Sequence, residues 1–324
     1  MRAAWYETQG PAREVLKVGI MAEPTPGPGE VRIRIAASGI NPGDIKKRQN
    51  AFGYGMPYPR VIPHSDGAGH VDLVGEGIAA DWIGRRVWCY GAQSYRPFGT
   101  AAEYTVVPAA QAVSLPDGVS FEQGACLGIP AITAHRCVHA AAPVDGRTVL
   151  IQGGAGAVGV CAVHLARRAG ALVIATVRSS SDEPIARAAG AHHVLPQGPD
   201  LIERVRALAP GGIHHIVEVA FGANIATDLE LLAVRGSVAA YATDTDTPAL
   251  PFWPLLFKNI RVDFLGSDDF TASDKAEAAR AVNDALAAGW AGMPISERFS
   301  LEDIVPAHER VEAPRQRGRV VVMP

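Results

Sequence analysis

The stretch TVLIQGGAGAVGVCAVHLARRAG, residues 148–170, decides the fold of this chain. A short apolar run over 149–152 predicts a buried strand, and the apolar spacing over 158–169 predicts a helix. Between the strand and the helix stand the glycines of a G-x-G-x-x-G spacing, namely Gly154, Gly156 and Gly159. In this setting the first glycine permits a tight turn, the second lets the main chain approach a pyrophosphate, and the third lets the helix lie close to the strand.

A helix that begins at such a turn points N–H groups and a partial positive charge toward a phosphate. The sequence therefore predicts a dinucleotide-binding turn formed by Gly154, Ala155, Gly156, Ala157, Val158 and Gly159. The alternative is a mere contact between small residues of helix and strand. The strand-like run ALVIATV at 171–177 favours the dinucleotide, because a second strand at this distance is what the motif requires.

Strand-like and helical stretches alternate after about residue 125. The strand-like runs lie at 172–177, 193–195, 214–219 and 236–242, and the helical stretches at 183–189, 200–209 and 224–234. Such alternation builds a parallel sheet through right-handed crossovers. We therefore expect an α/β fold with a doubly wound parallel sheet.

The two ends of the chain have a different texture. Short apolar runs separated by Gly and Pro predict an irregular, largely antiparallel β domain over about the first 125 residues, with helical patterning only around 42–50 and 120–124. Near the C-terminus the pattern predicts a helix over 275–289 and a final strand over 318–323. We expect this tail to pack back onto the first domain.

The residue that distinguishes one dinucleotide from another lies about 20 residues beyond the turn. Arg178 stands 19 residues after Gly159 and is followed by Ser179. A carboxylate at this point would bind a ribose hydroxyl, whereas guanidinium and serine hydroxyls bind a 2′-phosphate, which predicts NADPH. The alternative is a solvated strand end with Ser181 capping the next helix. Asp182 lies too late in the chain to replace the missing carboxylate.

Composition narrows the functional classes. The 324 residues are 48% hydrophobic and 19% charged, with a formal net charge of −3, which argues against a nucleic-acid partner or an anionic membrane surface. The sequence shows neither a membrane-spanning apolar run nor an apolar signal core, so we expect a soluble cytoplasmic protein. The four cysteines form no C-x-x-C pair, which indicates scattered buried thiols.

Several longer stretches cover nearly the whole chain. They are SGINPGDIKKR (38–48), IPHSDGAGHV (62–71), FGTAAEYTVVPA (98–109), LPDGVSFEQGACLGIPAITAH (115–135), GGAGAVG (153–159) and GRVVV (318–322). Together they resemble the medium-chain dehydrogenase/reductase superfamily, in its zinc-independent quinone oxidoreductase (zeta-crystallin-like) branch. The resemblance implies a GroES-like β-barrel catalytic domain over 1–124 and 268–324, a Rossmann domain over 125–267, and NADPH in the cleft between them.

The zinc alcohol dehydrogenases share this fold, but their ligand positions are filled differently here. Asn41 stands where the resemblance places a ligand cysteine, and Ser65 where it places a ligand histidine. An amide and a hydroxyl are poor zinc ligands beside thiolate and imidazole, so no metal is predicted. His64 is expected to make an ordinary hydrogen bond, with no thiolate or second histidine at hand.

Without a metal, a quinone or an α,β-unsaturated carbonyl is the easier acceptor of hydride, because negative charge spreads to its carbonyl oxygen. Asn41 is predicted to donate its amide N–H to that oxygen. The resemblance implies the same catalytic role and a cofactor contact, while a turn residue before Pro42 is the alternative. Asp44 either braces the pocket or, as we expect, caps the helix that follows.

The proton donor stays open. Phe52 stands where some relatives carry a tyrosine, and Tyr54 follows it. Tyr54, water, or no donor at all are the alternatives, and Tyr54 and Phe52 are as readily explained as apolar lining of a pocket rim.

The resemblance implies further cofactor contacts by position. They are Thr133 in the PAITAH helix, Ala220 and Phe221 after the fourth Rossmann strand, Tyr241 and Ala242 after the fifth, Phe264 to Gly266 beside the carboxamide, and Arg319, with Arg317, toward a phosphate. For the two arginines a charged strand flank is the commoner meaning. His192 and His193 are treated as structural.

The segment TPALPFWPLLFKNIRVDFLG at 247–266 joins an aromatic stretch to a strand. The resemblance implies that this strand lies at a sheet edge and pairs with a two-fold mate, which predicts a homodimer; a core strand is the alternative. The function expected is that of an NADPH-dependent quinone or enone reductase. The alternatives are a non-catalytic, crystallin-like NADPH-binding protein and a reductase or dehydrogenase of another carbonyl or alcohol.

Overall fold

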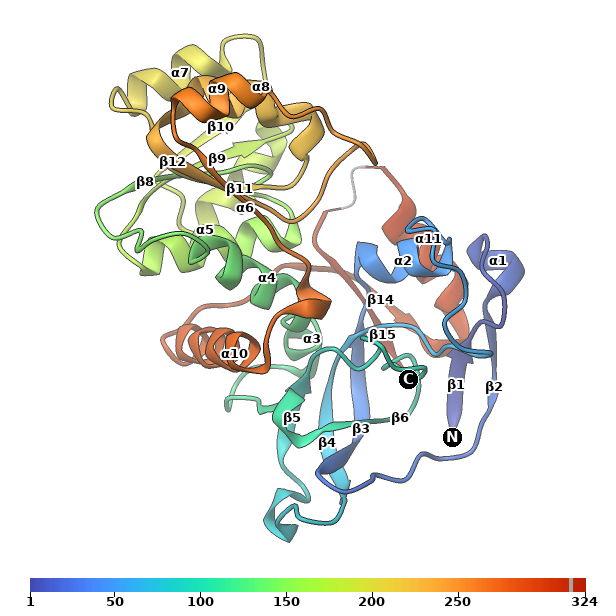
Figure 1. The fold of residues 1–324 in the computed structure, drawn as a ribbon. Coiled ribbons are helices and arrows are strands. Elements are labelled where there is room, and N and C mark those ends of the chain that lie inside the picture. The colour runs from blue at the N-terminus through green and yellow to red at the C-terminus, as the bar shows by residue number, and fades with distance from the viewer. Residues whose placement is uncertain (315–316) are drawn as a thin grey trace. The chain divides into compact units, whose positions relative to one another are not determined.

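Residues 1–314 and 317–324 are described by a computed structural model, in which the chain forms two units (Figure 1). Unit 1 comprises residues 1–130 and 275–324, and unit 2 comprises residues 131–274. The chain thus leaves unit 1, forms unit 2 and returns to unit 1. The returning tail pairs its last strand with a strand of the first segment, which confirms that the tail packs back on the first domain.

Unit 2 is built on a six-stranded parallel sheet with the strand order β10-β9-β8-β11-β12-β13. The strands are β8 (Thr148–Ile151), β9 (Leu172–Val177), β10 (His193–Pro196), β11 (Ile213–Glu218), β12 (Leu232–Ala240) and β13 (Arg261–Phe264). Counted along the unit, the sheet runs third, second, first, fourth, fifth, sixth, which is the doubly wound order of dinucleotide-binding folds. The predicted doubly wound parallel sheet is confirmed.

Helices cover this sheet, which explains why its strands are almost continuously apolar. They are α5 (Ala157–Arg168), α6 (Glu183–Ala188), α7 (Leu201–Leu208), α8 (Phe221–Leu231) and α9 (Phe252–Phe257), while α4 (Gly128–Val138) and α10 (Ala272–Ala287) cross the limits between the units. Strand β12 begins earlier than predicted. Its register shifts between the Ile213–Leu232 and His215–Ser237 pairs, and Arg235 has a φ of 62°, so a bulge interrupts the period-2 pattern.

Unit 1 carries a seven-stranded sheet with the order β14-β15-β3-β4-β5-β7, and β6 also pairs with β3. The strands are β3 (Glu30–Gly39), β4 (Asp66–Val74), β5 (Arg86–Cys89), β6 (Tyr104–Pro108), β7 (Ala112–Ser114), β14 (Ile295–Ser300) and β15 (Arg319–Met323). Their pairings are antiparallel except that of β14 with β15, so the largely antiparallel prediction is confirmed.

The remaining elements of unit 1 lie outside this sheet. They are the antiparallel pair β1 (Arg2–Trp5) and β2 (Lys17–Ile20) and the helices α1 (Ala12–Val15), α2 (Pro42–Arg48), α3 (Phe121–Gly124) and α11 (Ile304–Glu312). Helices α1 and α11 were not predicted. In α11 only a few positions, such as Ile304 and Ala307, are buried, and the charged residues between them conceal the helical period.

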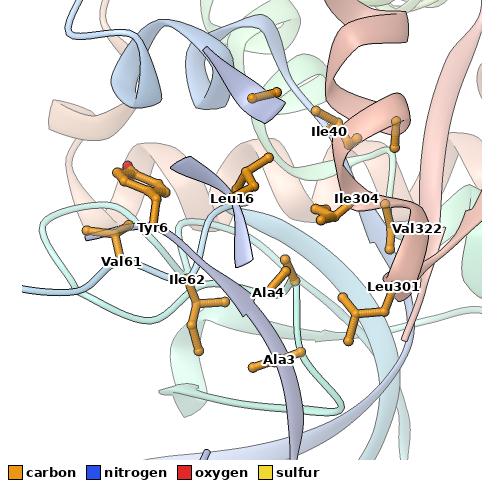
Figure 2. Close-up of a cluster of buried hydrophobic side chains, with 14 of the residues drawn as sticks. Ala3, Ala4, Tyr6, Leu16, Ile40, Val61, Ile62, Leu301, Ile304 and Val322 are labelled. Atoms are coloured by element: carbon orange, nitrogen blue, oxygen red, sulfur yellow. The ribbon is translucent and has the colours of Figure 1, made fainter. Parts of the chain in front are cut away.

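One core joins the two ends of the chain within unit 1. Figure 2 shows Ala3 and Ala4 of β1 beside Leu301, Ile304 and Val322 from the returning tail. All five side chains are buried. Because apolar burial is the main stabilising contribution in folding, the tail is an integral part of this unit.

Candidate nucleotide-binding turn and polar cluster

The turn after β8 is tighter than its glycine spacing predicts. The left-handed residue is Gly153, with a φ of 70°, and not Gly154 as we expected. A Cβ on Gly154 would lie 2.7 Å from Cβ of Ala175 in β9. Gly154 is therefore required by close packing of the turn against the neighbouring strand, and the tight turn itself depends on the glycine before it.

Gly159 has the packing role that we predicted, whereas the pyrophosphate contact of Gly156 stays a prediction. A Cβ on Gly159 would lie 2.2 Å from the carbonyl oxygen of Gly153, so only glycine allows α5 to lie this close to the strand. A Cβ on Gly156 would meet only the Gly153 oxygen, at 3.3 Å, within 4 Å among the described residues. Gly156 is the N-cap of α5 and supplies no side-chain cap, so the first N–H groups of the helix face an open approach. This geometry fits a pyrophosphate.

A buried polar network supports the turn from behind. The Gly153 N–H donates to Thr176 Oγ1 at 3.2 Å, Thr176 donates to Gln152 Oε1 at 2.6 Å, and Gln152 Nε2 donates to Asp228 Oδ1 at 2.8 Å. Burial, and then the charge of Glu218, raise the pKa of Asp228 well above its usual value. The protonated form of Asp228 is therefore favoured. This pair was not predicted, because Glu218 lies on β11, Asp228 lies on α8 and no motif marks them.

The residues predicted at the ends of three strands are close together. The Phe221 N–H donates to the Ala242 carbonyl at 3.2 Å, and the rings of Phe221 and Phe264 lie 5.1 Å apart, edge to face. The Ala220 N–H donates to Glu218. These contacts place Ala220, Ala242 and Phe264 at the carboxyl edge of the sheet, where ligands of such sheets bind.

Three further residues with predicted cofactor contacts are Thr133, Gly266 and Tyr241. Thr133 is buried in α4. Gly266 follows Phe264 in a position where an added Cβ would meet nothing within 4 Å. Burial of its hydroxyl raises the pKa of Tyr241 well above the usual value, with Cys137 and Glu218 as neighbours, so this hydroxyl points into the unit. Their cofactor contacts stay predictions.

Arg178 is the exposed residue that follows β9. Ser179 donates its hydroxyl to Asp182 Oδ2 at 3.0 Å and lies 2.8 Å from Ser181 Oγ, in the short 3-10 turn Ser180–Asp182. The turn thus brings the Asp182 carboxylate against Ser179. We had expected Asp182 to lie too late in the chain to replace the missing carboxylate. A guanidinium and a carboxylate stand on either side of the Ser179 hydroxyl in the sequence, and they act on a bound phosphate with opposite sign.

In unit 1 the side chain of Asn41 is held from both ends. Its Nδ2 donates to Asp66 Oδ2 at 2.8 Å, and its Oδ1 accepts from Arg319 Nη2 at 2.8 Å. A guanidinium only donates, so the Arg319 bond fixes the amide with its oxygen toward Arg319 and its nitrogen toward Asp66. Its main-chain N–H donates to Asp44 Oδ2 at 2.7 Å, which confirms that Asp44 caps α2. All four residues are buried.

Asp66 is the acidic centre of this cluster. Its oxygens also accept from the Ile129 N–H at 2.9 Å. Burial raises the pKa of Asp66 to about 7, against the opposing effects of the Asn41 hydrogen bond and of Arg319. We did not predict Asp66, although the quoted stretch IPHSDGAGHV contains it. Arg319 is buried, so its predicted phosphate contact stays a prediction for a guanidinium that already has Asn41 as a partner.

His64 departs from its expectation in one respect. It makes the hydrogen bond we predicted, with Ser38 Oγ 2.8 Å from Nδ1. A second histidine is nevertheless at hand, because His308 Nε2 lies 2.9 Å from His64 Nε2. The two are 244 residues apart in the chain, so sequence spacing gave no sign of the pair.

Tyr54 and Phe52 lie in the exposed segment after α2. Their rings stack with centroids 5.9 Å apart. The neighbouring phenol of Tyr54 contributes, after burial and Asp44, to raising the pKa of Tyr6. The structure thus places Tyr54 on the surface of unit 1, and its role as proton donor stays a prediction.

Among residues 1–314 and 317–324, no group of three or more His, Cys, Asp or Glu side chains is arranged to hold a metal ion. All four cysteines are buried and free, as predicted. No helix in the described part of the chain is long and apolar enough to cross a membrane.

A six-stranded doubly wound sheet with a glycine turn that fits a pyrophosphate, next in the chain to a mostly antiparallel β unit, defines a dinucleotide-binding protein of the dehydrogenase type. Two family models match the chain: "Alcohol dehydrogenase GroES-like domain" over residues 27–117 and "Zinc-binding dehydrogenase" over residues 157–283. The second model does not include the positions of Asn41 and Ser65.

Full-length relatives agree with these matches. The quinone oxidoreductases of Mus musculus and Homo sapiens are each 30% identical to this chain and cover 94% of it and 92% of their own length. A mycobacterial protein whose structure was solved in complex with NADPH is 28% identical, with a TM-score of 0.87 and full coverage of both chains. The chain belongs to the medium-chain dehydrogenase/reductase superfamily, in its quinone oxidoreductase (zeta-crystallin-like) branch.

Proposed function

We propose that this protein is an NADPH-dependent reductase that transfers hydride to a quinone or an α,β-unsaturated carbonyl without a metal ion. The observation that carries the proposal is the Asn41 amide, which is buried and oriented between the carboxylate of Asp66 and the guanidinium of Arg319. The names of the mammalian relatives support a quinone as acceptor. The NADPH complex of the mycobacterial protein supports the cofactor.

The residues of unit 2 bind and orient the cofactor. The first N–H groups of α5 and the open face of Gly156 receive the pyrophosphate. Arg178 receives the 2′-phosphate through charge-assisted hydrogen bonds. NADPH, when bound, supplies the hydride.

Asn41 serves the acceptor. An amide nitrogen carries two hydrogens, and the hydrogen bond to Asp66 uses one of them. We assign the second to the carbonyl oxygen of the substrate, where negative charge develops as the ring or the double bond receives hydride. One proton completes the balance, so that NADPH, H⁺ and quinone give NADP⁺ and hydroquinone. Water or Tyr54 supplies this proton.

The experiment is NADPH oxidation with a panel of para-quinones, ortho-quinones, enones, and simple aldehydes and ketones, alongside NADPH and NADH titrations. We expect turnover with quinones or enones and tighter binding of NADPH. Tight NADPH binding without turnover on any acceptor would favour a non-catalytic, crystallin-like role. Turnover restricted to simple carbonyls would favour the other alternative, a reductase or dehydrogenase of another substrate.

A matched pair of variants tests the role of Asn41. Asn41→Ala removes the amide, and we expect kcat to fall by about 10²-fold, the usual cost of one oxyanion donor. Asn283→Ala makes the same change in an amide of α10 that accepts from Trp88 Nε1 at 3.0 Å and donates to the Ser114 carbonyl at 2.8 Å, and it serves as the control. Equal activity of Asn41→Ala and the parent would remove the amide from the mechanism.

We further propose that the protein is a homodimer formed through unit 2. Strand β13 is the last strand of the sheet, so in the described part of the chain no further strand pairs with its outer edge. The adjacent helix α9 exposes Phe252, Trp253 and Phe257, whose exposed fractions are 61%, 64% and 73%. An apolar surface beside an open edge is suited to a two-fold partner of the same chain.

A further inference from the structure

A continuous line of hydrogen bonds crosses the interior of unit 1 and ends at Asp66. Every side chain in it is 0% exposed. In order, the links are Arg48 Nε to His308 Nδ1 at 3.4 Å, His308 Nε2 to His64 Nε2 at 2.9 Å, His64 Nδ1 to Ser38 Oγ at 2.8 Å, Ser38 Oγ to Thr100 Oγ1 at 2.7 Å, and Thr100 Oγ1 to the Asp66 carbonyl at 2.6 Å. We call these residues the hydrogen-bond line.

The end at Asp66 sets the direction of the first links. A main-chain carbonyl only accepts, so the Thr100 hydroxyl donates its one hydrogen to Asp66. Thr100 Oγ1 must then accept from the Ser38 hydroxyl. Because Ser38 has now used its one hydrogen, His64 Nδ1 must be the donor to Ser38 Oγ.

The remaining links follow from the two imidazoles. Burial lowers the pKa of His64 to about 3 and that of His308 well below its usual value, so both rings are neutral and carry one N–H each. With its hydrogen on Nδ1, His64 accepts at Nε2 from His308. His308 then accepts at Nδ1, where the donor is Arg48.

The far end agrees with this assignment independently. Arg48 carries a guanidinium, which can only donate, and it also contacts Glu312 and the Gly10 carbonyl. A donor-only group at one end and an acceptor-only group at the other leave one arrangement of hydrogens for all five bonds. Each buried polar group in the line is thereby satisfied, which is the condition under which such networks make a structure more rigid.

The line cannot conduct protons. The guanidinium at its start does not release a proton, and the amide carbonyl at its end does not pass one on. What the line can do is hold its last member in place. That member is Asp66, whose carboxylate accepts from Asn41.

The loop that carries His64 is itself strained and closely packed. His64 has a φ of 75°, a conformation that a side chain other than glycine adopts at a cost. Its carbonyl accepts from the Thr100 N–H at 3.0 Å, and a Cβ on Gly99 would lie 2.1 Å from the same oxygen. The loop is thus held by side chains and main chain together just before β4 begins at Asp66.

We propose that His64, His308, Ser38 and Thr100 are positioning residues, which hold the main chain of Asp66 so that its carboxylate keeps the Asn41 amide aimed at the substrate oxygen. The catalytic consequence rests on the proposed function. The direction of the hydrogen bonds does not, so the two can be tested separately.

The first test reads the tautomers by ¹⁵N NMR of histidine-labelled protein, without substrate. We expect His64 to carry its hydrogen on Nδ1 and His308 on Nε2, with each signal assigned by its loss in a His64→Asn or His308→Gln variant. Finding the hydrogen of His64 on Nε2, or a charged ring at either position near neutral pH, would overturn the proposal.

The second test uses a matched pair at the last link. Thr100→Ser keeps a hydroxyl, whereas Thr100→Val keeps the shape and removes it. We expect Thr100→Val to lower kcat about tenfold with little change in KM for NADPH, and Thr100→Ser to retain most of kcat, because a displaced donor affects the reacting geometry more than cofactor binding. Equal kcat in both variants, or parallel losses of kcat and stability in both, would refute the positioning role.

A second pair guards against loss of folding at Thr100. His308→Gln can still donate to His64, whereas His308→Leu cannot. Rescue of kcat by glutamine relative to leucine is expected, and failure of rescue with both variants folded counts against the proposal. If the unmodified protein reduces no quinone or enone, the proposed function fails. The NMR result still decides the direction of the hydrogen bonds in the hydrogen-bond line.

Discussion

At the scale of single residues, we expect cofactor preference to depend on the opposite charges of Arg178 and Asp182. We predict that Arg178→Asp weakens NADPH binding about 10- to 100-fold, the usual worth of a charge-assisted hydrogen bond, and moves preference toward NADH. Parallel fluorescence titrations with both cofactors measure this. Arg206→Asp is the control, because Arg206 is also exposed but lies in the last turn of α7 and pairs with Glu230. An unchanged NADPH to NADH ratio in Arg178→Asp would show that this arginine is only a solvated strand end.

Another residue-scale prediction concerns Asp66 and pH. Its pKa in the folded protein is about 7, against 3.8 for an ordinary aspartate, so between these values the folded chain holds a proton that the unfolded chain has released. The free energy of unfolding therefore falls as pH rises through this window, by at most about 1.4 kcal/mol per pH unit. Urea unfolding between pH 5 and 8 should show a shallower fall in Asp66→Asn. The exposed Asp117→Asn should keep the parent's slope, and a parent slope in Asp66→Asn as well would contradict the prediction.

At the scale of elements, two glycines between β8 and α5 have different roles: Gly159 allows close packing, and Gly156 leaves an open approach. Gly159→Ala would drive its Cβ into the Gly153 carbonyl oxygen at 2.2 Å, so we expect a loss of stability of at least about 1–3 kcal/mol. Gly156→Ala meets that oxygen at 3.3 Å and should alter the melting temperature little.

The variant that should keep its stability, Gly156→Ala, should nevertheless lose NADPH binding. We expect Gly156→Ala to bind NADPH at least about tenfold more weakly than the parent while remaining folded, because its methyl group occupies the approach of the pyrophosphate. Thermal unfolding and NADPH titration together check the pair. A Gly156→Ala variant that binds NADPH like the parent would show that the pyrophosphate does not lie against this glycine.

At the scale of the whole molecule, local patterns and distant contacts differ in what the sequence reveals. The alternation of strands and helices after residue 125 depends on neighbouring residues, and strand β9 matches its predicted range of 172–177. Asn41 and the glycine turn could be found because motifs mark them. The His64–His308 pair, the Asp228–Glu218 pair and the contact of Asp66 with Asn41 could not, because folding brings their members together from distant positions. Helix α11, which carries His308, was also missed.

The largest-scale prediction concerns assembly. The outer edge of β13 and the exposed face of α9 lie next to each other in the chain, and an edge strand with an apolar neighbour is a surface that proteins usually cover. We predict that light scattering after size exclusion gives a dimer for the parent and a monomer for the double variant Trp253→Glu with Phe257→Glu, because paired chains would bury like charges against each other. Ile20→Glu with Ile83→Glu makes the same chemical change at exposed positions of unit 1 and should leave the dimer intact. A parent that elutes as a monomer at micromolar concentration would contradict the dimer. A double variant that stays dimeric would show that the interface lies elsewhere. Since the proposed chemistry needs only residues of one chain, NADPH binding by the monomeric variant should remain within about twofold of the parent.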